Sequence, residues 1–225
     1  MTRWSKRIDA LVREVAGSCR PALQRDLGIW MHASPRFEAF VTANHDKVRK
    51  KLSTTSGEEA RLDIRAELLV AHLILADRRF ELTFEAYGAR QAAPDLTAMY
   101  RTNERFNIDV TRLRSRNEND TAFARLTNTI AGKLRQLPPG IPNVLVIVTR
   151  DLPNAAAQLG AAARPLRGRV EGRLSGVFIL DEHAYGPEPP TYLAAPGARH
   201  PMSVEALRRI ERCLAAGQLA ANEPG

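Results

Sequence analysis

The chain has 225 residues, 44% of them hydrophobic, which is enough for one substantial α/β domain with a packed core. Its 33 basic and 25 acidic residues give a formal net charge of +8, which favours a polyanionic partner such as nucleic acid, although a merely solvated basic surface explains the excess equally well. Two distant cysteines, Cys19 and Cys213, argue against a disulfide framework and a thiolate metal site, and no stretch approaches membrane-spanning length.

The N-terminal segment is predicted to be a helical layer. Apolar residues recur at helical spacing within residues 4–15, and again within residues 37–52 after Pro35. The second helix is expected to end in the cationic turn 47–51, which either complements the helix dipole or lies along a phosphate backbone. The start of the chain is charged and lacks the apolar centre of a signal peptide, so the sequence predicts a cytoplasmic protein with no membrane partner.

A polar linker at residues 53–57 separates this layer from the next helix. Ser56 and Glu59 have the spacing of a capping box, which predicts a module boundary in the linker and a helix at 58–77. The helix is almost entirely apolar after its first two turns, as expected of a helix buried on several sides. Glu67 lies on a face that must otherwise be buried, so its carboxylate requires a cation, a metal ion or hydrogen-bond donors. A structural salt bridge and a functional site both satisfy this requirement.

The chain is next expected to form a mixed sheet. Strand-like segments at 81–86, 94–100 and 106–113 are joined by short turns and predict an antiparallel meander. An amphipathic helix at 119–137 stops at a Pro-Pro-Gly sequence, and the apolar run 143–149 is typical of a buried strand. The predicted order is α-β-β-β-α-β.

The C-terminal third is predicted to extend the same sheet. An Ala-rich stretch at 155–163 precedes a strand at 176–180, and a Pro/Gly-rich loop at 185–201 leads to an amphipathic helix at 203–216. The last residues are expected to be disordered. The sequence thus predicts an N-terminal helical extension (1–55), an α/β domain (56–218) and a disordered tail (219–225).

Two aspartates lie where predicted strands can bring them together. Asp95 opens the second strand, and Asp109 alternates with apolar residues in the third, so both carboxylates can face one side of the sheet. The main-chain carbonyl of Val110 can add a third oxygen. Because two carboxylates, a carbonyl and water suit Mg²⁺, these three residues form a candidate metal site, and Glu85 is a further acid that either joins it or lies exposed.

These features together resemble the PD-(D/E)xK nuclease superfamily over residues 58–149. The resemblance rests on a helix with Glu67, then Pro94-Asp95, then the acid-x-Thr strand from Asp109 to Thr111, followed by a helix and a strand. It implies a restriction-endonuclease-like mixed central sheet and hydrolysis of phosphodiester bonds with Mg²⁺ or Mn²⁺, in DNA more than in RNA. It also implies that Asp95 and Asp109 are metal ligands and that Glu67 completes the carboxylate cluster and orients a water molecule.

In this resemblance Thr111 occupies the position of the family's catalytic lysine. A threonine hydroxyl cannot supply the cation that orients water and stabilises developing negative charge. Strand alternation points the adjacent Arg112 away from the carboxylates. Lys133 on the following helix has a stem long enough to reach the site, and a surface lysine near a helix C-terminus is the alternative interpretation.

Two functions are consistent with this pattern. The first is a Mg²⁺-dependent nuclease. The second is a catalytically inactive protein of the same fold that binds nucleic acid or a protein partner, and Thr111 favours it. No P-loop or nucleophile elbow is present, and the histidines, including His72 in the apolar helix, lack metal-ligand spacing. The candidate catalytic residues are Glu67, Asp95, Asp109, Thr111 and Lys133.

Overall fold

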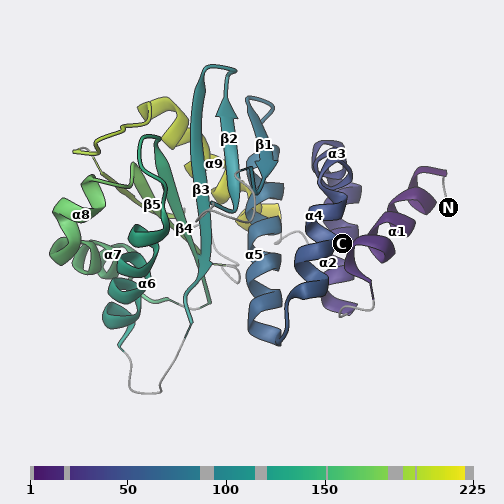
Figure 1. Cartoon of the computed structure of the whole chain (residues 1–225), viewed down its shortest axis with the longest axis horizontal. Helices are drawn as coiled ribbons and strands as arrows, with labels where there is room; N and C mark the ends of the chain where they lie inside the picture. Colours follow the sequence, from purple (N-terminus) through teal and green to yellow (C-terminus); the bar gives the residue numbers. More distant parts are fainter. Residues whose placement is uncertain are drawn as a thin grey trace.

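A six-stranded mixed sheet forms the centre of the molecule (Figure 1). The computed structural model describes residues 3–17, 21–86, 94–114, 121–150, 152–181, 190–195 and 197–220. The strands stand side by side in chain order: β1 (Phe80–Phe84), β2 (Leu96–Tyr100), β3 (Glu104–Arg112), β4 (Asn143–Thr149), β5 (Gly176–Asp181) and β6 (Thr191–Ala194). The first three form the predicted antiparallel meander, β3, β4 and β5 are parallel, and β6 returns antiparallel to β5. The prediction of a mixed α/β sheet is confirmed.

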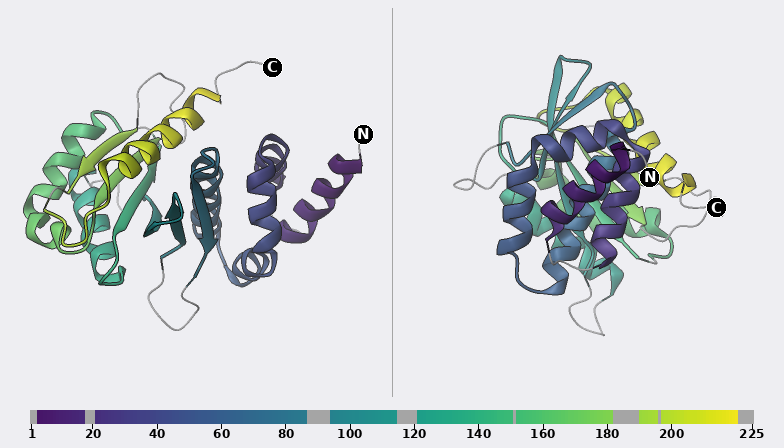
Figure 2. Two further views of the ribbon diagram at one scale, coloured as in Figure 1. Left: turned by 90° about the horizontal axis from the view of Figure 1, so that it is seen from above. Right: turned by 90° about the vertical axis from the view of Figure 1, so that its right-hand side faces the viewer.

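Helices cover both faces of this sheet. They are α1 (Arg3–Ala16), α2 (Pro21–Ala33), α3 (Pro35–Ala43), α4 (His45–Thr54), α5 (Glu58–Leu75), α6 (Ala122–Gln136), α7 (Ala155–Ala163), the 3-10 helix η1 (Arg164–Leu166), α8 (Arg167–Glu171) and α9 (Val204–Ala220). Seen from above, the layer of α6, α7 and α8 is followed by the sheet, then by α5, and then by the N-terminal helices (Figure 2). Among the described residues, no helix has both the length and the apolar character needed to cross a bilayer.

Side-chain alternation along the central strands divides the core into two clusters. In β4, Val144, Val146 and Val148 face α5, α9 and the N-terminal helices, whereas Leu145 and Ile147 face α6, α7 and α8. Because β4 is buried on both faces, its sequence is a continuous apolar run that contains no polar alternation. The same division determines on which side of the sheet each residue of β3 projects.

The N-terminal layer differs from the prediction in two places. The segment 35–52 forms two helices because the chain turns at Asn44, whose side chain donates a hydrogen bond to the Phe40 carbonyl oxygen at 2.8 Å and ends α3. The helix α2 was not predicted. Its buried stripe consists only of Leu23, Leu27 and Met31, and Gly28 lowers its intrinsic helix propensity, so the periodic signal in the sequence is weak.

Three further features differ from the sequence analysis. The helix α5 starts after Gly57, which adopts φ 89° and makes no side-chain cap, so the predicted capping box does not form. The short edge strand β6 lies inside the predicted loop 185–201, and the Ala-rich stretch is α7. The helix α9 reaches Ala220, so residues 219 and 220 are helical and not part of a disordered tail, while residues 221–225 lie outside the described residues.

Candidate carboxylate and lysine site

Glu67 is buried on α5, as the apolar pattern around it requires, and its cation comes from the N-terminal layer. The side chain of Glu67 is only 6% exposed, and Lys51 Nζ of α4 lies 2.7 Å from its Oε2. The same ammonium group lies 2.9 Å from Glu85 Oε1 and 3.4 Å from Asp95 Oδ1. Lys51 therefore joins three acids that come from α5, from the end of β1 and from the start of β2.

Asp95 is fixed by the backbone of the neighbouring strand. The pairing of β2 with β3 stops at Leu96 and Ile108, so beyond this point β3 has lost its partner on that side. Asp95 Oδ2 takes the partner's place and accepts a hydrogen bond from the Val110 N–H at 2.9 Å. Since the N–H and C=O groups of a strand residue point to the same neighbour, the Val110 carbonyl also faces this gap.

Asp109 projects from β3 toward α6. Its neighbours Ile108 and Val110 belong to the core on the α5 side, so alternation directs Asp109 to the opposite face. There Lys133 Nζ lies 2.8 Å from Asp109 Oδ2. Oδ2 is buried, and Lys133 is its ion-pair partner.

Thr111 and Arg112 lie at the end of β3, and both line a hollow together with Lys133 on the α6 side. Arg112 turns to α5, where its Nη1 lies 3.0 Å from Glu59 Oε2. The structure thus brings Lys133, and not Arg112, to the carboxylate of Asp109.

Burial and mutual repulsion raise the pKa of two acids in this group. For Glu67, burial and the charge of Asp95 outweigh the opposing effect of Lys51, so its pKa lies well above the usual value. Burial and Asp95 likewise raise the pKa of Asp109 to about 6, against the effect of Lys133. Burial alone would lower the pKa of each lysine, but the neighbouring carboxylates raise both pKa values above normal, which keeps the lysines charged.

The cluster has more acids than bases. Four carboxylates (Glu67, Glu85, Asp95 and Asp109) meet two ammonium groups (Lys51 and Lys133), so the fully ionised cluster carries a formal charge of −2. Within the described ranges, no three His, Cys, Asp or Glu side chains are close enough together to hold one metal ion. The oxygens of Asp95, Asp109 and the Val110 carbonyl are nevertheless hard donors of the kind that Mg²⁺ prefers, and a divalent cation would balance this charge.

Lys51 is the residue of this cluster that the sequence left unassigned, while Glu85, one of whose two predicted alternatives was to join it, pairs with Lys51. The turn 47–51 was predicted to serve the helix dipole or a phosphate backbone. Lys47 and Lys51 instead point inward, where Lys47 Nζ donates to the Phe84 carbonyl oxygen at 2.8 Å. The only signal in the sequence was the buried Glu67, which required a cation without indicating which one.

The remaining candidates for metal or thiol chemistry have structural positions. His72 stacks on Trp30 and meets Phe37 edge to face, and burial lowers its pKa to about 4. Cys213 is a buried free thiol, while Cys19 lies outside the described residues. Comparisons with protein-family models, with curated protein sequences and with solved structures find no match for this chain.

Proposed function

We propose that this chain is a metal-dependent nuclease that hydrolyses phosphodiester bonds in nucleic acid and is built on a restriction-endonuclease-like fold. The observation that carries the proposal is the meeting of Asp95, Asp109 and Lys133 at the point where β2 begins beside β3. The element order α5-β1-β2-β3-α6-β4, with an antiparallel meander followed by a parallel crossover strand, supports the same assignment.

Lys133 offers the cation that Thr111 lacks. The lysine comes from α6 and not from β3, yet its ammonium group is in contact with the carboxylate two residues before Thr111. An ammonium group here can orient the attacking water and stabilise negative charge on the phosphoryl oxygens. The threonine in the motif is thus compatible with catalysis when Lys133 takes over the lysine's role.

The other residues have distinct tasks in this mechanism. Asp95, Asp109 and the Val110 carbonyl would hold Mg²⁺ or Mn²⁺, which when bound supplies Lewis-acid activation of water. Glu67 orients the water whose oxygen attacks phosphorus. As the water oxygen forms its bond to phosphorus, one P–O ester bond breaks, the water loses one proton, and the leaving oxygen takes up one proton. Basic residues near the cluster bind the flanking phosphates.

A second function is favoured by the contacts of Lys51. This residue pairs with Glu67, Glu85 and Asp95, so these carboxylates already have a counter-ion without any metal. In that case the acids and lysines form a structural network, and the chain binds nucleic acid or a protein partner without cleaving it.

A cleavage assay distinguishes the two functions. Supercoiled plasmid and labelled oligonucleotides of DNA and RNA are incubated with Mg²⁺ or Mn²⁺ and with wild type, Asp109→Asn or Lys133→Met. Loss of one electrostatic or acid–base group costs roughly 10²- to 10³-fold in rate, so a nuclease should lose its cleavage in both variants. Lys50→Met, which alters an exposed lysine of α4, is the matched control and should cleave like wild type.

The outcomes exclude each other. Metal-dependent cleavage that disappears with Lys133 supports the nuclease. If wild type binds nucleic acid but never cuts it, and Thr111→Lys switches cleavage on, the inactive function is correct for the native chain.

A further inference from the structure

A polar hollow lies between the end of β3 and one face of α6. It has a volume of about 480 Å³ and lies directly beside the cluster, because Thr111 and Lys133 belong to its lining. Among the described residues, eleven line the hollow, of which five are basic and none is acidic. The lining residues are Thr111, Arg112, Arg114, Arg125, Asn128, Thr129, Ala131, Gly132, Lys133, Arg135 and Gln136.

The sequence of α6 creates this hollow. Leu126, Ile130 and Leu134 form the stripe that packs into the core, and the hollow lies along the neighbouring stripe, from Arg125 to Gln136. Ala131 and Gly132, which carry little or no side chain, leave space along this stretch of α6. A Cβ atom added at Gly132 would meet no other atom within 4 Å, so the space above this residue is open.

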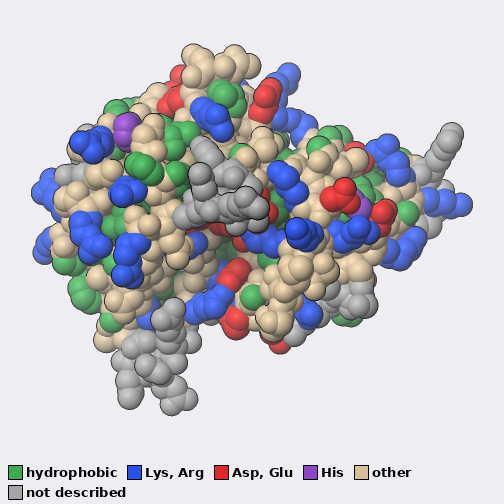
Figure 3. All heavy atoms as spheres, in the orientation of Figure 1, with side chains coloured by type: hydrophobic (Ala, Val, Ile, Leu, Met, Phe, Trp, Pro, Cys, Tyr) green, Lys and Arg blue, Asp and Glu red, His purple; other side chains and the backbone are tan. Residues whose placement is uncertain are grey.

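The two walls of the hollow differ in how their charges are balanced. On the β3 side, Arg112 and Arg114 form ion pairs with Glu59 and Asp63 of α5, which hold both guanidinium groups in position. On the α6 side, Arg125 and Arg135 have no acidic partner within the described part of the chain, and Arg125 Nε is buried without a hydrogen bond. Figure 3 shows Lys and Arg side chains over α6, α7 and α8 with few acids between them.

We infer that this hollow, named here the α6 cleft, binds the phosphate backbone of a nucleic-acid strand. The inference rests on the proposed function for its orientation, since Lys133, which lies between Arg125 and Arg135 along α6, lines the same hollow and contacts Asp109. A guanidinium group with no carboxylate partner is suited to grip phosphate oxygens with two parallel hydrogen bonds. The unpaired arginines of α6 therefore supply the binding charge, and the paired arginines of β3 shape the opposite wall.

The lining also indicates how the strand is recognised. None of the described lining residues is aromatic, so they offer no platform on which bases could stack. Contacts to phosphates give affinity without reading sequence. The α6 cleft is therefore expected to bind strands of different sequence with similar affinity and with strong dependence on salt.

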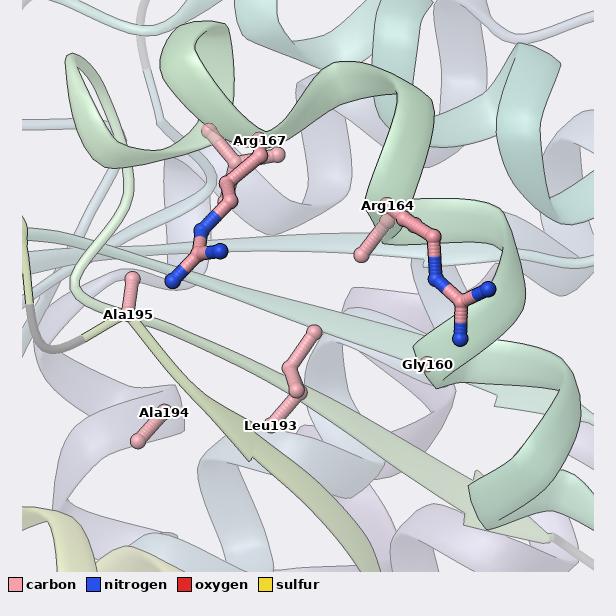
Figure 4. A pocket seen from close by; sticks show the side chains of 8 residues that line it. Gly160, Arg164, Arg167, Leu193, Ala194 and Ala195 are labelled. Atoms are coloured by element: carbon pink, nitrogen blue, oxygen red, sulfur yellow. The ribbon is translucent and has the colours of Figure 1, made fainter.

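The test measures binding in EDTA, so that no cleavage takes place. A fluorescent oligonucleotide is titrated with wild type and with Arg125→Gln/Arg135→Gln over a series of salt concentrations. Removing two phosphate contacts should lower the slope of log K against log[salt] by about 1.4 for a single strand and about 1.8 for a duplex. The matched control is Arg164→Gln/Arg167→Gln, which alters the two arginines over a smaller hollow beside β6, of about 250 Å³ (Figure 4). The control should keep the wild-type slope.

A second pair of variants tests the location without removing any native charge. Gly132→Glu places a carboxylate in the open space of the cleft, and Gly132→Gln places a neutral side chain of the same size there. We expect the glutamate variant to bind at least tenfold more weakly than the glutamine variant, because only the former repels phosphate.

The results separate this inference from the proposed nuclease function. An unchanged salt slope in Arg125→Gln/Arg135→Gln, or equal binding by the two Gly132 variants, overturns the α6 cleft even if wild type cuts DNA. A lowered slope supports the cleft even if wild type never cuts. No binding by wild type at low salt overturns the cleft.

Discussion

Asp109 titrates differently from an ordinary aspartate because it is buried next to another acid. Its pKa is about 6 in the folded chain instead of 3.8. Between about pH 4 and 6, the folded state therefore holds a proton that the unfolded state has lost. The contribution of Asp109 to the free energy of unfolding is greatest below this range and disappears as the pH rises through 6.

This linkage gives a prediction for Asp109→Asn, which cannot titrate. We expect the Tm of wild type minus that of Asp109→Asn to fall as the pH rises from about 4 to 7. The measurement is thermal unfolding followed by circular dichroism at half-unit steps, with Asp46→Asn at an exposed position as the control. A difference that stays constant or grows over this range contradicts the raised pKa.

The contacts of single residues were predictable from the sequence only in part. The apolar face around Glu67 was sufficient to predict that its carboxylate needs a partner, and the helical position of Lys133 was sufficient to make it a candidate. The pairing of Lys51 with Glu67 was not predictable, because it joins residues from two helices whose relative placement depends on tertiary packing.

At the level of elements, α4 is attached to the sheet domain by its inward-facing lysines. Lys51 contacts α5 and both strand ends of the cluster, and Lys47 caps the end of β1. Removing one partner of a buried ion pair leaves the other charge without compensation, which costs about 3 kcal/mol. We therefore expect Lys51→Met to lower the free energy of unfolding by about this amount, as measured by urea denaturation.

Two comparisons make this prediction specific. Lys50→Met changes an exposed neighbour and should leave stability within about 0.5 kcal/mol of wild type. The double variant Lys51→Met/Glu67→Gln should recover much of the loss, since it removes the uncompensated carboxylate. Equal stability of Lys51→Met and Lys50→Met would show that the ion pair contributes little to the free energy of unfolding.

The elements themselves were predictable where one periodicity dominates. The apolar run of β4 and the long apolar helix α5 were assigned correctly, with the ends of α5 shifted by up to two residues. The strand β6 was not predicted, because its four residues are flanked by Pro and Gly and are only partly buried at the edge of the sheet. Its pairing with β5 depends on contacts that local sequence does not encode.

At the level of the whole molecule, the N-terminal helices share a core with the sheet. Buried residues of α1 to α4 belong to the same hydrophobic cluster as α5, α9 and one face of the sheet. Phe37 of α3, for example, is fully buried against Trp30 and His72. The boundary predicted in the linker 53–57 therefore separates two segments of sequence whose side chains pack together.

The last prediction concerns whether these segments unfold together, and the two tryptophans make it measurable. Trp4 and Trp30, the only tryptophans of the chain, both belong to the N-terminal helices, so their fluorescence follows that layer and the packing of Trp30 on α5. Far-UV circular dichroism follows the helices and strands of the whole chain. Because the shared core couples the layer to the sheet, we expect the two signals to change at the same urea concentration in a single transition. Phe37→Ala, which creates a cavity in the N-terminal layer, should lower the free energy of unfolding by about 3 kcal/mol or more. The midpoints of both transitions should then move to the same lower urea concentration. Fluorescence that changes at lower urea than circular dichroism would instead mean that residues 1–55 form an extension that unfolds separately.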